Sequence, residues 1–148
     1  MALEMILPSG TVPFQTSTSH EYPSSFPPAP PVVNPTLVDR RNDFHVHAHW
    51  HTQGGIFALM NPAFKWKGEA IFEQMGKEEV SFDPFVATVP FIPTAANQHY
   101  DLTIDVKPNE VPSGIYRVIL KLCLDIGGKS TPVCGFDDLG LIEFYDGM

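Results

Sequence analysis

The chain has 148 residues, and its 17 Asp and Glu against 9 Lys and Arg give a formal net charge of −8 at pH 7. Binding to a phosphate backbone requires a clustered cationic surface, so this balance predicts no nucleic-acid partner. Hydrophobic residues make up 43% of the chain, enough for one buried core, whereas 15 prolines and 11 glycines are too many for a helical bundle. No apolar run approaches the roughly 18 residues that a spanning helix needs, so we expect no transmembrane segment.

The first eight residues do not have the features of a secretory signal. They contain no positive charge, carry an acid at Glu4, and their apolar stretch stops at Pro8. We therefore expect no export by the general pathway and take a cytoplasmic location as the default.

Composition changes sharply near residue 38. Residues 1–38 hold eight of the 15 prolines but only two charged residues, Glu4 and Glu21. Proline fixes its own φ and restrains the preceding residue, so the proline-rich centre at 26–33 is expected to be extended. These features divide the chain into an extended Pro-rich N-terminal arm, residues 1–38, and a folded domain, residues 39–148.

The arm carries apolar side chains that could anchor it on a protein surface. These are Leu3, Ile6, Phe14 and Phe26. A segment already extended by proline loses less conformational entropy when it docks. The arm therefore predicts an assembly element that engages a neighbouring copy or another protein partner. The alternative is that the arm lies on its own domain.

From residue 43 onward the sequence has the alternation and the turn residues of a β protein. Residues 44–51 alternate strictly, and Pro90 interrupts another apolar stretch in a way typical of an edge strand. Residues 69–77 are also compatible with one or two helical turns. We count seven or eight short strands and expect an all-β fold, either an immunoglobulin-like or a jelly-roll β-sandwich. The expected strands cover residues 44–51, 56–60, 64–73, 85–92, 99–107, 116–124 and 133–145.

One local pattern bears on the type of sandwich. Apolar residues alternate over 102–106, and after a turn the chain continues as Gly-Ile-Tyr-Arg-Val at 114–118. This pattern resembles the corner between strands E and F of immunoglobulin-like sandwiches, and the resemblance implies that Tyr116 hydrogen-bonds back across the corner. It also implies three inward residues on the next strand, namely Val118, Leu120 and Leu122. No cysteine follows two residues after Tyr116, so the inter-sheet disulfide of that family is absent, and the resemblance implies no function.

Four histidines occupy every second position of one expected strand. They are His45, His47, His49 and His51. Alternate residues of a strand face the same side, so their Cβ atoms should lie about 7 Å apart in a row. Imidazole pairs suit Zn, Cu and Ni, and His99 or a neighbouring carboxylate could add a ligand. We hypothesise a divalent transition-metal site here. The alternatives are an outward face that simply points to solvent or to the arm, and a pH switch made of clustered imidazoles.

The His-x-His spacing also partly resembles cupins, a family of metal-binding jelly rolls. That resemblance implies an oxygenase or an isomerase. The chain departs from the family pattern, because no glutamate lies in residues 50–54 and no histidine follows His99.

Cys123 and Cys134 flank a loop centred near Gly128. In a hairpin with that centre the two thiols would lie opposite each other and could form a disulfide. The alternative is a pair of reduced thiols in a cytosolic protein. Five acids near the C-terminus are expected to form a solvated, acidic edge that discourages strand pairing. They are Asp125, Asp137, Asp138, Glu143 and Asp146.

No nucleophile, phosphate-loop or dinucleotide motif occurs, so the sequence indicates no catalytic and no cofactor-binding residue. The prediction from sequence is a non-enzymatic structural or assembly subunit, a homo-oligomer or a partner of another protein, without a cofactor. The second prediction, from a different class, is a metal-binding protein that uses the four-histidine strand.

Overall fold

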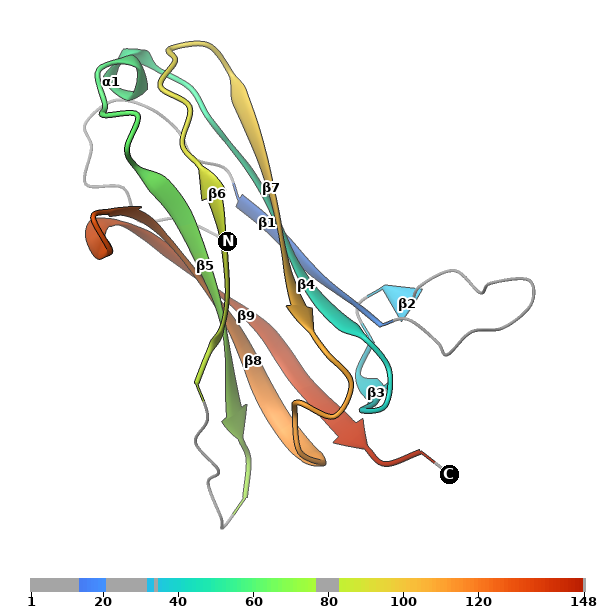
Figure 1. The fold of residues 1–148 in the computed structure, drawn as a ribbon. Helices are drawn as coiled ribbons and strands as arrows, with labels where there is room; N and C mark the ends of the chain where they lie inside the picture. Colours follow the sequence, from blue (N-terminus) through green and yellow to red (C-terminus); the bar gives the residue numbers. More distant parts are fainter. Residues whose placement is uncertain (1–13, 21–31, 34, 77–82, 148) are drawn as a thin grey trace.

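The structure is a computed structural model that describes residues 14–20, 32–33, 35–76 and 83–147, with side chains from Pro35 onward (Figure 1). Within these residues the chain forms nine strands and one short helix. The arm positions Leu3, Ile6 and Phe26 lie outside the described residues. None of the helices in the described part of the chain is long and apolar enough to cross a membrane.

The elements follow one another with short connections over most of the folded domain. Their bounds are β1 (Phe14–His20), β2 (Val32–Val33), β3 (Leu37–Asp39), β4 (Phe44–Thr52), α1 (Gly55–Ala58), β5 (Lys65–Gln74), β6 (Phe85–Pro90), β7 (Gln98–Val106), β8 (Gly114–Ile126) and β9 (Lys129–Tyr145).

The strands form two sheets that pack face to face (Figure 1). One sheet has the order β2-β1-β4-β7 and the other has the order β3-β9-β8-β5-β6. Every pairing is antiparallel except that of β3 with β9, which is parallel. The prediction of an all-β sandwich is confirmed, and β6, which ends at Pro90, is an edge strand as its proline indicated.

Alternation along each strand places the core between the sheets. On β4 the buried side chains are Phe44, Val46, Ala48 and Trp50, and the histidines point the other way. Trp50 meets Trp66 of the opposite sheet edge to face, with ring centroids 5.5 Å apart.

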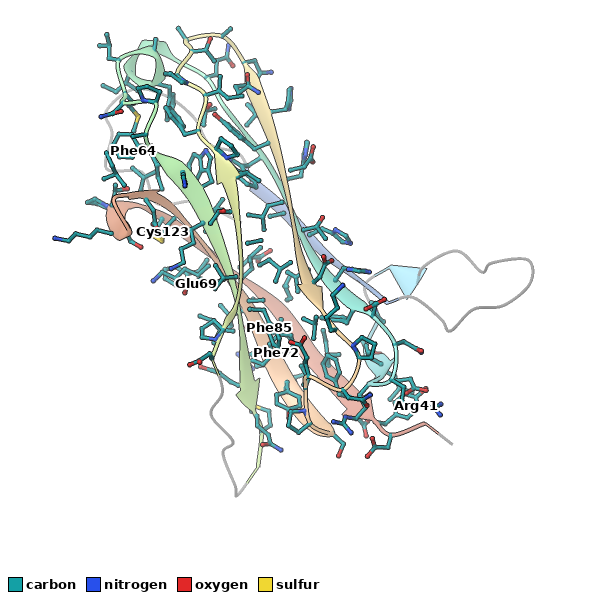
Figure 2. All side chains as sticks on the ribbon, in the orientation of Figure 1. Arg41, Phe64, Glu69, Phe72, Phe85 and Cys123 are labelled. Atoms are coloured by element: carbon teal, nitrogen blue, oxygen red, sulfur yellow. A yellow bond between two sulfur atoms is a disulfide. The ribbon has the colours of Figure 1, made fainter. Side chains whose placement is uncertain are left out.

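A second aromatic contact lies towards the other end of the sandwich. Figure 2 shows Phe72 and Phe85 there, and their ring centroids are 5.4 Å apart. On the same strand as Phe72, Gly68 leaves room for the facing sheet, because a Cβ atom there would lie 2.8 Å from Leu102 Cδ2. The close approach of the sheets explains why a glycine stands inside this strand.

Two stretches were ambiguous by periodicity alone. Residues 69–74 continue β5 as a strand rather than forming helical turns, because their alternate side chains face the core. The apolar run at 56–60 instead begins with the single-turn helix α1, where the chain crosses from one sheet to the other. Phe57 of this turn is fully buried and closes that end of the core.

The corner motif at Tyr116 is confirmed. Its hydroxyl donates to the Pro112 carbonyl oxygen at 2.8 Å, and the ring is fully buried. The inward residues of β8, Val118, Leu120 and Leu122, are also fully buried. Strands β4 and β7 lie in one sheet, and strands β9, β8 and β5 are neighbours in the other. In an immunoglobulin-like sandwich, strands B and E face strands G, F and C in the same chain order. The strand order therefore matches that of an immunoglobulin-like sandwich rather than that of a jelly roll.

Replacing Tyr116 with Phe removes this hydrogen bond but keeps the ring. We expect Tyr116→Phe to lower the free energy of unfolding in urea by about 1 kcal/mol. Tyr145→Phe is the matched control on an exposed ring, with an expected change within about 0.5 kcal/mol. Equal effects of the two substitutions would contradict a stabilising role for the corner.

The structure joins Cys123 and Cys134 in a disulfide. The two residues are directly opposite in the β8–β9 hairpin, with Cα atoms 4.1 Å apart. The turn itself uses Gly127 and Gly128, whose positive φ angles of 58° and 78° suit a two-residue hairpin turn.

Loop closure by this disulfide spans 11 residues, so we expect the double variant Cys123→Ala/Cys134→Ala to lose about 2–3 kcal/mol of stability. Urea unfolding with and without a thiol reductant measures this loss. Reduction should destabilise the unaltered chain by a similar amount and leave the double variant unchanged. A reductant effect on the double variant would show that the change arises elsewhere.

Candidate functional site

The outer side of β4 and β7 carries the most unusual group of side chains in the described residues. Antiparallel pairing places His45 opposite Asp105, His47 opposite Thr103, His49 opposite Asp101 and His51 opposite His99. We call these eight residues the histidine face. Their neighbours in sequence point into the core, so the whole group is directed away from the opposite sheet.

Two imidazoles of the histidine face contact carboxylates across the strand pair. His45 Nδ1 lies 2.7 Å from Asp105 Oδ1, and His49 Nδ1 lies 2.5 Å from Asp101 Oδ1. Each of these contacts is a hydrogen bond, and it becomes an ion pair when the imidazole is protonated. Both involve exposed carboxylates, so their contribution to stability is modest.

The other histidines contact neutral groups. His47 Nδ1 is 3.1 Å from Thr103 Oγ1. His99 lies between two rings, stacked on His49 with centroids 5.9 Å apart and tilted against His51 with centroids 5.4 Å apart. The face therefore alternates imidazoles that are bonded to a carboxylate with imidazoles that are opposite a threonine or another histidine.

Burial lowers the pKa of His47 below its usual value of 6.5, and the neighbouring His45 lowers it further. The nearby Asp105 acts in the opposite direction but less strongly. The folded chain therefore favours the neutral form of His47 more than the unfolded chain does.

This shift has a defined effect on stability. Because the unfolded chain binds a proton at His47 more readily, the stabilisation is present above pH 6.5 and is lost as the pH falls through the folded-state pKa. We expect His47→Gln to flatten the dependence of the unfolding free energy on pH between about pH 7.5 and pH 5. Thr103→Val removes the hydroxyl that contacts His47 but keeps the imidazole, so the unfolding free energy should keep its dependence on pH. An unchanged slope in His47→Gln would contradict this account.

The metal hypothesis named His45, His47, His49 and His51. The structure brings all four to one side of one strand, with His99 beside them. Among the described residues, however, no three or more His, Cys, Asp or Glu side chains are arranged to hold a metal ion. The metal site stays a prediction from sequence.

The sequence did not single out three members of this face: Asp101, Thr103 and Asp105. Alternation over 99–107 indicated that they point away from the core. It carried no sign that β7 pairs with β4, because 45 residues separate Thr52 from Gln98 along the chain and two strands of the other sheet intervene.

The other edge of β4 is occupied by a segment of the predicted arm of the same chain, so the described part of the arm lies on its own domain. Residues 14–20 form β1 and pair antiparallel with β4 over seven positions, from Phe14 opposite Trp50 to His20 opposite Phe44. Figure 1 shows β1 running alongside β4. Of the four predicted anchors, Phe14 alone falls within a described strand. The division of the chain at residue 38 stays a prediction.

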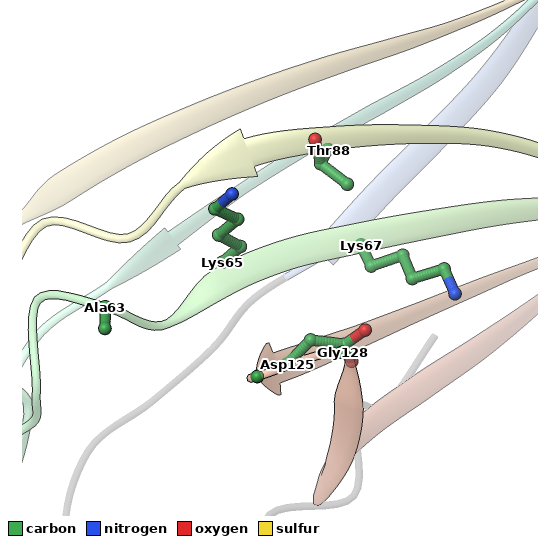
Figure 3. Close-up of a pocket in the computed structure, with 7 residues that line it drawn as sticks. Ala63, Lys65, Lys67, Thr88, Asp125 and Gly128 are labelled. Carbon is green, nitrogen blue, oxygen red and sulfur yellow. The ribbon is translucent and has the colours of Figure 1, made fainter.

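A separate cavity of about 370 Å³ lies on the outer side of the other sheet (Figure 3). It is lined by Ala63, Lys65, Lys67, Thr88, Asp125, Gly127 and Gly128. Lys67 is paired with Glu69 at 3.1 Å, and Asp125, only 8% exposed, is opposite Lys65 in the strand register. The two lysines and the two acids in and around this cavity are equal in number, but Asp125 Oδ1 is buried and accepts no hydrogen bond from the described residues.

The acids expected to form a solvated edge are in part neutralised by arginine. Asp138 pairs with Arg117 at 3.1 Å, and Asp146 pairs with Arg40 at 2.8 Å. The rest of the acidic cluster does not converge on one site: Asp125 lies at the cavity, whereas Glu143 pairs with β3.

No family model matches the chain, and neither a curated protein nor a solved structure shows significant similarity to it. The chain therefore resembles immunoglobulin-like sandwiches in its strand order and in the hydrogen bond of Tyr116.

Proposed function

We propose that this chain is a non-enzymatic assembly subunit, a β-sandwich that engages neighbouring copies or a protein partner through its N-terminal arm. The observation that carries the proposal is the pairing of residues 14–20 with the edge of β4. In the structure this pairing is formed within one chain, so the described part of the arm lies on its own domain. The same backbone pairing between two chains would be recognition by strand addition.

Strand addition suits a segment of this composition. The affinity comes from backbone hydrogen bonds, so the strand needs no charged side chains, and the arm has only Glu4 and Glu21. The proline-rich sequence beside the strand restricts the free arm and so lowers the entropy lost on association.

The outer side of the five-stranded sheet offers a second reason to favour contact with other molecules. Leu37, Ile115 and Leu141 lie on β3, β8 and β9 with exposed fractions of 55%, 46% and 49%. Leu37 and Ile115 are both opposite Glu143 in the register, so apolar groups gather around this row. Neighbouring exposed apolar side chains are typical of protein interaction surfaces.

A truncation that begins at Pro35 tests the proposal, because it removes β1 and β2 but retains β3. We expect the full chain to form an oligomer or a stable complex in light scattering coupled to size exclusion. The truncated chain should lose that species. A chain that begins at Phe14 is the matched control, since it keeps β1 and should still assemble.

A point substitution covers the case in which the truncated chain fails to fold. Thr16→Pro removes one backbone donor in the middle of β1 and should weaken assembly, whereas Thr11→Pro, which leaves residues 14–20 unchanged, should not. Assembly of both the truncation and Thr16→Pro at the level of the full chain would refute the proposed function.

A further inference from the structure

We infer that the cavity beside the β8–β9 turn binds a small zwitterion of the α-amino acid class, whose ammonium group contacts Asp125 and whose carboxylate contacts Lys65. The residues described around this cavity come from the loop before β5, from β5, β6 and β8, and from the turn after β8. None of them belongs to β1, so the inference goes beyond the proposed assembly function and does not depend on it.

Asp125 is the residue that points to a ligand. It lies on the outer side of β8, because the preceding Leu124 is directed into the core, yet only 8% of its surface is exposed. Its Oδ1 atom is buried and accepts no hydrogen bond from the described residues. A buried carboxylate oxygen without a donor is costly to the folded chain. A ligand that donates to this oxygen would remove that cost.

Two lysines of β5 bring positive charge to the same cavity. In the strand register Lys65 is opposite Asp125, and Lys67 is opposite Cys123. Lys67 is already paired with Glu69 at 3.1 Å. Lys65 is exposed and forms no ion pair with Asp125 or with any other described residue. The ammonium group of Lys65 is therefore the one that is available to an anionic group of a ligand.

The hairpin turn leaves one side of the cavity open. Gly127 and Gly128 line this side, and a Cβ atom added to either would have no other atom within 4 Å. Figure 3 shows Asp125 beside Gly128, and the two lysines extend from β5 in different directions. The cavity volume of about 370 Å³ lies at the lower end of the range for small-molecule sites. A ligand of few atoms therefore fits.

The two unpaired charges select the class of ligand. Asp125 requires a donor, and an ammonium group supplies a donor together with the counter-charge. Lys65 requires an acceptor, which a carboxylate supplies in the same way. An α-amino acid carries both groups on one carbon atom. A neutral sugar could donate a hydroxyl to Asp125, but it would leave both protein charges without a counter-charge.

The disulfide next to the cavity holds the strand that carries Asp125. Cys123 lies two residues before Asp125, on the same side of β8, and is joined to Cys134 directly across the hairpin. This link restricts the position of Asp125 before any ligand arrives. Binding to a site whose groups are already in place loses less conformational entropy.

Calorimetric titration of the full-length chain with L-alanine tests the inference. Acetate and methylammonium serve as comparison ligands because each carries one of the two charged groups, and glucose carries neither. A ligand held at one group presents the other at a high effective concentration. We therefore expect L-alanine to bind at least about tenfold more tightly than acetate, methylammonium or glucose.

Two substitutions separate the two contacts. Asp125→Asn removes the counter-charge for the ammonium group, and Lys65→Gln removes the cation that faces the carboxylate. Each should weaken L-alanine binding at least about tenfold. Asp83→Asn and Lys107→Gln are the matched controls and should leave binding unchanged, because both residues are exposed and do not line the cavity. Lys65 is also exposed, so Lys65→Gln tests the site even if Asp125→Asn does not fold.

Three results would overturn the inference. The first is the absence of L-alanine binding to the unaltered chain. The second is equal binding by the unaltered chain, Asp125→Asn and Lys65→Gln, which would place the ligand elsewhere. The third is glucose binding as tight as that of L-alanine, which would indicate a site for neutral polyols. None of them bears on assembly, which the truncation that begins at Pro35 tests separately.

Discussion

The pairing of β4 with a strand on each side is the constraint on which the rest of the structure depends. One side of β4 buries Phe44, Val46, Ala48 and Trp50, and the other carries four imidazoles. Because the period of a strand is two residues, a slip of one position would exchange these sets and place histidines in the core. The contact of Trp50 with Trp66 connects this register to the opposite sheet.

The two edges of β4 are covered in different ways. β7 supplies carboxylates and a hydroxyl to the histidines, so side-chain chemistry reinforces the backbone ladder on that edge. β1 precedes the proline-rich residues 26–33 in the chain, and it pairs with the other edge of β4 through backbone groups.

Fold and candidate site were predictable to different degrees. Alternation over 44–51 indicated a strand with an apolar and an imidazole side, and the tyrosine at 116 indicated the corner and its inward neighbours. Residues 69–74 and 56–60 were ambiguous, because a short apolar run fits a strand or a helical turn until its surroundings are known. The disulfide was one of two alternatives, since a facing pair of thiols requires the hairpin register.

The sequence by itself determined which side chains share a side of each strand, because that property depends on local geometry with a period of two. The tertiary structure decided which strands are neighbours: β7 beside the histidines, β1 at the opposite edge of β4, and β3 beside β9. Such pairings join segments far apart in the chain through backbone groups that are alike in every residue. Their choice therefore depends on how the whole domain packs, and no single segment encodes it.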